Sequence, residues 1–482
     1  MTIPVENFTG RALELRKLKD LVPHPGPRLV VITGRRRVGK SRLIQEFASN
    51  SNQCFFSFSG LAPVEGVTDQ TQRDAFGRQL AQLLNIAPVT FTDWSDAFYA
   101  LSQSLPANEP TVILLDEISW MAAKDVTFIP KLKVWWDLEM PKHPNAILVC
   151  CGSVSTWIEK NIIQSTAFFG RINLTMHLAP LSISESAELL KARGFKGSAY
   201  EIYKILAVTG GIPWYLEQIQ VAYMADKNIQ RLCFEKDGLL TTEFERIFHD
   251  LFNGAGDIYK KILRVLSAGM KTLSEIRQEL GYANSGTLSK LMKHLKIAGF
   301  VSEHPQWSIA TKKTSKQTLY RLFDSYTRFY LKYIEPIQIN ISQNTYQGLN
   351  LDQLINWPSI LGLQVENLLL ENRPLLLKHL DISRADIVGD NPYFQRATVK
   401  KKGCQIDYLV QTRTNNLLVC EFKCTRQEIN AEIIEEMREK IKRLEMPRGM
   451  AAVPVLFHLG EVAESVYSQR CFYRIIDIGE WV

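Results

Sequence analysis

The chain has 482 residues, of which 46% are hydrophobic and 22% are charged, a composition typical of an ordinary globular protein. Domains usually contain ~100 to 200 residues, so this length excludes a single hydrophobic core and predicts about three domains. The formal net charge of +7 permits nucleic acid as a partner but does not establish it.

The sequence also limits the compartment and the cross-links. No apolar run reaches the ~18 residues that a membrane span needs. The first ten residues, MTIPVENFTG, lack the pattern of a signal peptide. We therefore expect a cytoplasmic protein with no membrane partner. The eight cysteines form no CxxC pair, which argues against a disulfide framework and structural zinc, so most are expected to be buried thiols.

Residues 28–180 alternate strand-like runs with helical stretches. The runs RLVVIT, TVILLDE and NAILVCCG are continuously apolar, which predicts strands covered on both faces in a parallel sheet. The fold class is therefore α/β, with a doubly wound parallel sheet. Residues 181–250 are mostly helical, begin at a serine cap in SISESAELLKARG and break at Thr209–Pro213. This pattern predicts a small helical lid.

A glycine-rich motif follows the first strand. Gly34-Arg35-Arg36-Arg37-Val38-Gly39-Lys40-Ser41 matches GxxxxGK[ST], between the strand Leu29–Thr33 and a helix that begins near Ser41. The glycines permit dihedrals that point several N–H groups at a phosphate, and the helix adds its positive end. We therefore expect ATP as the ligand, with Lys40 on its β and γ oxygens and Ser41 on Mg²⁺.

A second strand ends in two carboxylates. Val112–Leu115 is followed by Asp116 and Glu117, at the distance along the chain expected of a neighbouring strand. Asp116 would hold magnesium through water, and Glu117 would polarise the attacking water. The alternative is a strand that merely ends in charge.

These residues give most of the chain a resemblance to the AAA+/STAND superfamily, specifically to its archaeal-type ATPase family. The resemblance also rests on Phe8–Arg11 with Glu14 and Leu15, and on the lid turn Gly210–Pro213. In such families the N-terminal segment and the lid turn close over the adenine, which makes Pro213 the expected base contact. A plain helix terminator is the alternative for Pro213.

The resemblance implies further roles around the phosphates. Ser153, after the strand Ala146–Cys151, would lie beside the γ-phosphate. Arg171 would neutralise transition-state charge in cis or from a neighbouring copy, so a homo-oligomer is among the expected partners; an ordinary surface arginine is the alternative. Arg35–Arg37 either serve the loop or project outward toward DNA or an acidic partner. The expected nucleotide-binding residues are Gly34, Arg35, Arg36, Arg37, Val38, Gly39, Lys40, Ser41, Arg42, Ser153 and Pro213.

Residues 256–310 give three short helical patterns and then a strand-rich end, as in a helix-turn-helix with a wing. Lys290, Lys293 and Lys296 recur along the third pattern and favour DNA as a partner, although such a domain also serves as a spacer. An aromatic helix is predicted over LYRLFDSYTRFYLKYIEP, and its rings are expected to pack domains together. Other basic clusters are Lys312 with Lys313 and Lys316, and Lys400–Lys402.

From about residue 346 a third unit begins. The strands that carry Asp407, in Gln405–Tyr408, and Glu421, after Leu417–Cys420, form a predicted hairpin centred on Thr414, which places these two carboxylates opposite each other. Opposed like charges are unfavourable, so a divalent metal such as Mg²⁺ or Mn²⁺ between them would relieve the repulsion. Lys423 lies on the same face as Glu421 and would orient or help deprotonate a water.

This hairpin resembles the PD-(D/E)xK nuclease superfamily, with Glu366 on the preceding helix as the helical acid. The expected helix over 425–445 carries an apolar stripe, and AAVPVLF is the expected final strand. Gln405 replaces the usual acid before the aspartate, which leaves one fewer charge for the metal. The alternatives are a degenerate fold that only binds and a solvated hairpin.

The predicted organisation is a P-loop ATPase core over 1–180, a helical lid over 181–250, a winged-helix domain with its connecting helix over 251–345, and a nuclease-like domain over 346–482. Two functions compete. One is an ATPase that binds DNA and couples nucleotide state to a metal-dependent nuclease. The other is a nucleotide-controlled signalling or assembly switch with a non-catalytic C-terminal binding module. A metabolic kinase is a weaker third choice, because no small-molecule acceptor site accompanies the P-loop.

Overall fold

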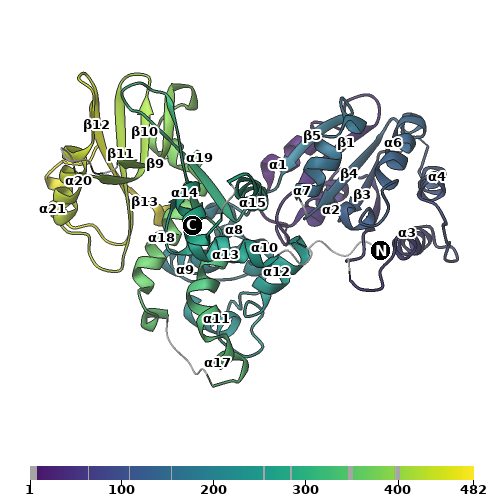
Figure 1. Ribbon diagram of the computed structural model, residues 1–482, viewed down its shortest axis with the longest axis horizontal. Coiled ribbons are helices and arrows are strands. Elements are labelled where there is room, and N and C mark those ends of the chain that lie inside the picture. The colour runs from purple at the N-terminus through teal and green to yellow at the C-terminus, as the bar shows by residue number, and fades with distance from the viewer. Residues whose placement is uncertain are drawn as a thin grey trace.

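A computed structural model describes residues 8–482, apart from residues 63, 108, 154, 253–255, 283–284, 346–350, 396 and 398–401 and the side chains of residues 155, 250, 252, 285, 316 and 352. The basic residues Lys400 and Lys401 therefore lie outside the described residues. In Figure 1 the N-terminal α/β unit, purple to blue, occupies one end of an elongated molecule. The C-terminal sheet, green to yellow, occupies the other end, and a mainly helical part lies between them.

The N-terminal unit is built on a parallel five-stranded sheet with the order β2-β3-β4-β1-β5, as in the P-loop NTPase fold. This confirms the predicted α/β class with a parallel sheet. The expectation that the Asp116 strand neighbours the P-loop strand is wrong, because β4 pairs with both β1 and β3 and lies between them. The strands are β1 (Arg28–Thr33), β2 (Cys54–Ser59), β3 (Thr111–Asp116), β4 (Ala146–Gly152) and β5 (Ile172–His177).

Helices cover both faces of this sheet (Figure 1). Along β1, Val30 and Ile32 belong to one hydrophobic cluster, which includes α2, while Leu29 and Val31 belong to another, which includes α3, α4 and α6. Continuous Val/Ile/Leu runs are therefore needed in the strands. The helices are α1 (Ala12–Lys19), α2 (Lys40–Asn50), α3 (Asp69–Leu84), α4 (Trp94–Ser104), α5 (Ile118–Met121), α6 (Phe128–Leu138), η1 (Met140–Lys142), α7 (Ser155–Ile158), η2 (Glu159–Ile163) and η3 (Thr166–Phe168).

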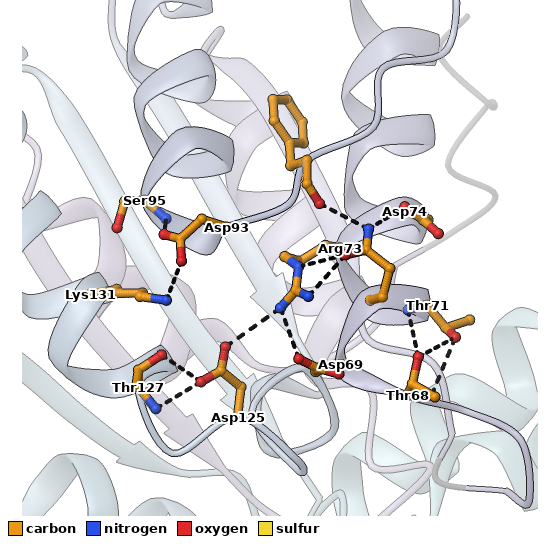
Figure 2. A network of polar contacts seen from close by, with 12 residues as sticks. Thr68, Asp69, Thr71, Arg73, Asp74, Asp93, Ser95, Asp125, Thr127 and Lys131 are labelled. Carbon is orange, nitrogen blue, oxygen red and sulfur yellow. Dashed lines mark hydrogen bonds and ion pairs between the residues drawn. The ribbon is translucent and has the colours of Figure 1, made fainter.

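A polar network joins the outer helices of this unit, as Figure 2 shows. Arg73 on α3 lies 3.1 Å from Asp69 and 3.6 Å from Asp125 in the loop before α6, and it is nearly buried. Lys131 on α6 pairs with Asp93, the N-cap of α4. The network ties three helices together at the edge of the sheet that lies far from the C-terminal unit.

The segment predicted as a helical lid consists of five helices. Ser182 caps the first one in a capping box with Glu185, as the sequence indicated. The break after Thr209 is made by Gly210 and Gly211, both of which have positive φ. The helices are α8 (Ile183–Ala192), α9 (Ala199–Thr209), α10 (Pro213–Glu217), α11 (Ala225–Cys233) and α12 (Glu243–Phe252).

The middle segment contains three helices and a three-stranded antiparallel sheet of order β6-β8-β7. The helices are α13 (Gly256–Ser267), α14 (Leu273–Leu280) and α15 (Ser285–Ile297). The strands are β6 (Lys271–Thr272), β7 (Val301–Trp307) and β8 (Thr314–Leu322). In α15, Leu288, Met292 and Leu295 are buried, whereas Lys290, Lys293 and Lys296 are exposed.

The predicted aromatic helix is partly wrong. Its first four residues, Leu319–Leu322, belong to β8, and Asp324 starts the helix by capping it with a hydrogen bond from the Thr327 N–H. The rings pack as expected, because Tyr326, Phe329 and Tyr330 are fully buried. The helical elements are α16 (Ser325–Phe329), the π-helix η4 (Tyr330–Ile334), η5 (Glu335–Ile337) and α17 (Gln338–Ser342).

The C-terminal unit holds a second five-stranded sheet, of order β13-β12-β11-β10-β9. Strand β10 is antiparallel to both β9 and β11, whereas β12 is parallel to both β11 and β13. The strands are β9 (Ile387–Gln395), β10 (Cys404–Thr412), β11 (Asn416–Cys424), β12 (Ala451–Leu459) and β13 (Arg474–Asp477). The helical elements are η6 (Leu351–Gln353), α18 (Trp357–Glu371), α19 (Arg373–Leu380), η7 (Arg384–Asp386), α20 (Glu432–Arg443), α21 (Glu464–Ser468) and η8 (Ile478–Trp481).

Two expectations for this unit change in detail. The helix predicted over 425–445 is shorter, because Ile429 forms a bridge with Val462 before α20 begins. The strand at AAVPVLF is β12, and β13 follows it. The apolar stripe of α20 does pack into the core through Ile433 and Met437.

The sheet of the middle segment packs against the C-terminal sheet. Trp307 Nε1 donates to Gln411 Oε1 at 2.8 Å, and Gln411 Nε2 donates to the Ile309 carbonyl at 2.9 Å. Trp307 and Ile309 share a hydrophobic cluster with residues of β10 and β11. The predicted boundaries at 180, 250 and 345 stay predictions, since the largest hydrophobic cluster crosses all three.

Among the described residues, none of the helices is both long and apolar enough to cross a bilayer. All eight cysteines are free thiols, and Cys150, Cys151, Cys233 and Cys420 are buried, so the expectation that most are buried holds for half of them.

Candidate functional site

The loop between β1 and α2 has the backbone shape that its glycines predict. Gly39 and Arg37 have φ values of 88° and 73°, in the left-handed region. Gly34 has a φ of 151°, and a Cβ added there would lie 2.5 Å from the Leu178 carbonyl oxygen. A side chain is thus excluded at Gly34 by β5 and its extension, which fixes the start of the loop against the sheet.

Lys40 is the first residue of α2, and its side chain is nearly buried. Its Nζ donates to the carbonyls of Gly34 at 3.0 Å and Arg35 at 3.1 Å. The ammonium group therefore lies inside the loop, where the phosphates of a nucleotide are expected. A phosphate would supply stronger, charged acceptors than these two carbonyls.

The two carboxylates after β3 have different partners. Ser41 Oγ donates to Asp116 Oδ2 at 2.5 Å, which joins the loop to the end of β3. Glu117 Oε2 accepts from Ser153 N at 3.0 Å and from Ser153 Oγ at 2.9 Å. Glu117 has a φ of 49°, so its backbone is held in the left-handed region. Because β4 lies between β1 and β3, Ser153 at its end is placed beside Glu117.

Lys40, Ser41, Asp116 and Glu117 line a cavity of about 690 Å³ between the core and the lid, whereas Ser153 lies behind Glu117 and is not part of the lining. Pro213 lies on its wall at the first position of α10, as expected of a base contact. Lid residues that the sequence did not single out also line it. The lining is Phe8, Thr9, Arg11, Arg36, Arg37, Val38, Gly39, Lys40, Ser41, Arg42, Asp116, Glu117, Leu181, Leu189, Ala192, Arg193, Pro213, Trp214 and Glu217.

The loop arginines differ from one another. The Arg35 side chain is buried and pairs with Asp324, so the expectation that it projects outward is wrong, whereas a contact of its backbone with phosphate stays a prediction. Arg37 lines the cavity, pairs with Glu243 at 3.1 Å, and places its guanidinium 3.4 Å from the centroid of the Trp214 ring. Arg36 and Arg42 line the cavity as expected. The two acids that hold Arg35 and Arg37 come from segments after the first lid helices.

Arg171 does not reach this cavity. Its Nε and Nη2 donate to the two carboxylate oxygens of Asp137 on α6, at 2.7 and 3.0 Å. This pairing lowers the pKa of Asp137 to about 2. The expectation that Arg171 neutralises transition-state charge in its own chain is therefore wrong for this conformation, because its guanidinium is bound to Asp137.

The cavity fits a nucleoside triphosphate with Mg²⁺. Its phosphate end has the positive end of α2 and the Lys40 ammonium group, and Ser41 and Asp116 supply a hydroxyl and a carboxylate for the ion. Together, the parallel sheet, the loop and this pair of strands define a P-loop nucleotide-binding domain.

Comparisons with known proteins agree with this class. Residues 8–219 match the family described as "ATPase domain predominantly from Archaea". An uncharacterized protein of Methanocaldococcus jannaschii is 26% identical over 335 residues, which cover 68% of this chain and 69% of that protein.

Two solved structures show lower similarity. A Walker-type ATPase of Pyrococcus abyssi aligns with 68% of this chain and 97% of its own, at 16% identity and a TM-score of 0.49. The ORC2 protein of Aeropyrum pernix aligns with 69% of this chain and 92% of its own, at 14% identity and a TM-score of 0.41.

The C-terminal hairpin has the predicted register. Tyr408 pairs with Cys420, so Asp407 and Glu421 stand at the next opposed positions of β10 and β11. Asp407 Oδ2 accepts from the Phe422 N–H at 3.0 Å. Burial and the charges of Glu421 and Glu366 raise the pKa of Asp407. Helix α18, which carries Glu366, packs against β11, which carries Glu421. The three predicted acids therefore lie in one region.

Each of these acids already has a partner, however. Glu421 pairs with Lys440 of α20 and, at 3.5 Å, with Lys423. Glu366 pairs with Arg321 of β8 at 2.6 Å. In the part of the chain that the structure describes, no group of three or more His, Cys, Asp or Glu residues has an arrangement that holds a metal ion. The cluster as described does not fit a metal.

Lys423 is also poorly suited to act as a base. Burial lowers its pKa, but Glu436, at 2.8 Å, and Glu421 raise it by more, and its pKa is above the usual value. The neighbouring carboxylates stabilise the ammonium form, and the expected role of Lys423 in orienting or deprotonating a water stays a prediction.

Several residues at the two sites were missed from the sequence. Asp324, Glu243, Arg321 and Lys440 pair with site residues that lie far away in the chain. No local motif identifies them. Trp214 had one usable signal, since it directly follows Pro213 in the lid turn.

Proposed function

We propose that this protein is an ATP hydrolase that binds ATP with Mg²⁺ in the cavity between the core and the lid. The observation that carries the proposal is the convergence of Lys40, Ser41, Asp116 and Glu117 on one cavity. Lys40 binds the phosphates, and Ser41 and Asp116 hold the ion. Glu117 orients the attacking water, while Ser153 positions the Glu117 carboxylate.

The test compares variants of the full chain. Lys40→Ala should lose binding of a fluorescent ATP analogue, because Lys40 is the one lysine among the described residues that line the cavity. Glu117→Gln should bind the analogue normally and lose phosphate release. Lys142→Ala, at an exposed lysine of η1, is the control and should behave as the wild type. Wild-type binding by Lys40→Ala, or hydrolysis by Glu117→Gln at the wild-type rate, would refute the assignment.

We also propose that a second copy of the chain supplies Arg171 after it leaves Asp137, since Arg171 does not line the cavity of its own chain. Mixing Lys40→Ala and Arg171→Ala chains tests this. A homo-oligomer with shared sites should recover part of the ATPase activity in the mixture, and a mixture without any gain contradicts it.

DNA is the macromolecular partner that we propose for the middle segment, which we interpret as a winged helix. Its strand β7 is occupied by the C-terminal sheet, so α15 is the element left for a groove. Lys290 and Lys293 are exposed on α15, whereas Lys296 pairs with Glu303. Contacts between such lysines and DNA phosphates give a binding affinity that falls as the salt concentration rises.

The DNA proposal is tested by fluorescence anisotropy with a labelled duplex at several salt concentrations. Lys290→Ala with Lys293→Ala should weaken binding and reduce the slope of log K against log salt by about two. The control, Lys227→Ala with Lys236→Ala, removes two exposed lysines from the region of α11. Equal losses in both double variants would contradict a role for α15.

Two functions remain for the C-terminal unit. The opposed acids Asp407 and Glu421 favour a metal-dependent deoxyribonuclease. The cations on these acids favour a non-catalytic binding module under nucleotide control, and we propose this module as the function of the conformation described. Plasmid cleavage with Mn²⁺, with and without ATP, decides between them. Cutting that Asp407→Ala abolishes would establish the nuclease, and no cutting under either condition would support the module.

A further inference from the structure

The side chain of Arg37 connects the nucleotide loop to the lid. Its guanidinium carbon lies 3.4 Å from the centroid of the Trp214 ring, and its Nη2 lies 3.1 Å from Glu243 Oε2. Arg37 has a φ of 73°, which a residue other than glycine keeps only where its surroundings fix it. These two contacts therefore hold the Arg37 side chain at one place between the loop and the lid.

Glu243 is a buried anchor for this contact. It is the first residue of α12 and is 1% exposed. Besides pairing with Arg37, it accepts a hydrogen bond from the Tyr215 hydroxyl at 3.3 Å, and Tyr215 directly follows Trp214 in α10. A carboxylate in such a poorly solvated place needs its partners, so Glu243 holds Arg37 and α10 together.

The lid turn has a second contact, with the segment before α8. The Leu181 N–H donates to the Gly211 carbonyl at 2.9 Å, and a Cβ at Gly211 would lie 2.4 Å from the Leu181 carbonyl oxygen. Gly211 also has a φ of 71°, so glycine meets both demands. The turn that leads to Pro213 and Trp214 is thus held by the Leu181 backbone and by the Arg37 guanidinium.

The Arg37 guanidinium is not arranged as a phosphate ligand, although the residue lines the cavity. Nη2 is paired with Glu243, and Nη1 is buried and has no hydrogen-bond partner among the described residues. The face of the Trp214 indole compensates for that partner, because it attracts a guanidinium electrostatically. By contrast, Lys40 Nζ binds two backbone carbonyls, which a phosphate can replace. Of these two cations, Lys40 is the one placed to bind phosphate.

The lid side of the cavity suits a nucleobase. Most of the apolar lining comes from the lid and from the N-terminal segment, whereas Lys40 and Asp116 lie at the loop end. Apolar and aromatic walls of this kind are typical of the part of a ligand site that binds a flat ring. A nucleotide with its phosphates at Lys40 would therefore place its base against the lid turn. The apolar residues of this part are Phe8, Leu181, Leu189, Ala192, Pro213 and Trp214.

We propose that Arg37 is a positioning residue for the base of the bound nucleotide. Its guanidinium fixes Trp214, and with it the lid turn, at a set distance from the phosphate loop. Arg37 thereby tightens the binding of a nucleoside triphosphate more than the binding of a phosphate chain alone. The inference rests on the proposed ATP site, and it gives a residue of the phosphate loop a role at the opposite end of the ligand.

The experiment measures the binding of two ligands to the full chain by isothermal titration calorimetry with Mg²⁺ present. One ligand is a non-hydrolysable ATP analogue, and the other is inorganic tripolyphosphate, which has no base. Arg37→Ala should lower the ratio of the analogue affinity to the tripolyphosphate affinity by about 5- to 30-fold, the equivalent of ~1 to 2 kcal/mol for a cation–π contact. An unchanged ratio, with equal losses for both ligands, would show that Arg37 binds phosphate and would overturn the proposal.

Glu243→Gln separates positioning from charge. Arg37→Ala removes a positive charge and Glu243→Gln removes a negative one, so a purely electrostatic effect on the phosphates has opposite signs in the two variants. Positioning predicts that both variants lower the ratio, because glutamine keeps an acceptor for Tyr215 but no longer forms an ion pair with the guanidinium. A wild-type or higher ratio in Glu243→Gln overturns the proposal, and this variant serves if Arg37→Ala does not fold.

Trp214→Leu tests the route through the indole. It should lower the same ratio, and adding Arg37→Ala to it should change the ratio by no more than about twofold, because contacts that act as a unit are not additive. A full additional loss overturns the route. The control, Arg426→Ala, removes a guanidinium 4.9 Å from the centroid of the Tyr200 ring. Neither of these two residues lines the cavity, so the control should keep the wild-type ratio.

The failures are distinguishable. If the wild type binds neither ligand, the proposed ATP site fails and the inference fails with it. If the wild type binds both ligands but Arg37→Ala and Glu243→Gln keep its ratio, the ATP site stands and the inference is overturned alone.

Discussion

The Glu117 carboxylate accepts two hydrogen bonds from Ser153, one from its backbone N–H and one from its Oγ. The side-chain bond can be removed without touching nucleotide or metal. Ser153→Ala should therefore lower kcat by about ten- to a hundredfold, since a hydrogen bond to a charged group contributes ~1.5 to 3 kcal/mol. Steady-state phosphate release, together with binding of a fluorescent nucleotide, checks this. A raised KM with an unchanged kcat would show instead that Ser153 binds substrate.

Gly34 and Gly39 predict different costs for the same substitution. A Cβ at Gly34 would meet the Leu178 carbonyl oxygen at 2.5 Å, whereas a Cβ at Gly39 has open space around it. Gly39→Ala should lower the free energy of unfolding by only ~1 to 2 kcal/mol, because alanine is strained in the left-handed region. Gly34→Ala should lower it by ~1 to 3 kcal/mol more, because its Cβ clashes with the carbonyl. Thermal unfolding without nucleotide measures both. Equal melting temperatures would contradict the close approach of β1 and the segment after β5.

Arg73 and Lys131 belong to the same network (Figure 2), but they should contribute differently to the stability of the fold. Arg73 is nearly buried between Asp69 and Asp125, whereas the Lys131–Asp93 pair is a quarter or more exposed. Arg73→Leu should lower the free energy of unfolding by about 1 to 3 kcal/mol because it leaves Asp125 without its cation. Lys131→Ala should lower it by less than ~1 kcal/mol. Urea unfolding of the two variants tests the order, and a larger effect at Lys131 would reverse it.

Asp407 predicts a specific dependence of stability on pH. Burial, then Glu421 and Glu366, raise its pKa in the folded chain to about 7, whereas an unfolded aspartate ionises near pH ~4. Between these values the folded state holds the extra proton, so its stabilising contribution is complete below pH ~4 and is lost as pH rises through about 7. Asp407→Asn should lack this loss.

Melting temperatures of both chains between pH 5 and pH 8, with chelator present, measure the effect. The melting temperature of Asp407→Asn should rise relative to that of the wild type as pH rises. Asp257→Asn, at a side chain that is 92% exposed, is the control. A constant difference between Asp407→Asn and the wild type across this range would show that Asp407 is ionised throughout.

What the sequence predicted well depends on local patterns. The P-loop, the carboxylates after β3 and the Ser182 cap follow from neighbouring residues, and the opposition of Asp407 and Glu421 follows from counting across one hairpin. Strand order does not follow in this way, and β4 lies where a direct β1–β3 contact was expected.

The partners of the site charges were beyond prediction for the same reason. Arg35 and Asp324 meet only after the core, lid and middle segment have packed together. Leu319–Leu322 shows a related failure, because pairing with β7 overrides the helical pattern of the residues that follow. Long-range packing decides both cases.

The hydrogen bond between Trp307 and Gln411 has a consequence for how the chain behaves when a protease cuts it. Gly389 of β9 leaves room for the Trp307 ring, since a Cβ there would lie 3.1 Å from the indole. A fragment that ends before residue 346 would expose this indole and Ile309 to water. A protease acting on the folded chain should thus yield a fragment in which β7, β8 and the C-terminal strands remain associated, because Trp307 and Ile309 share one hydrophobic cluster with β10 and β11.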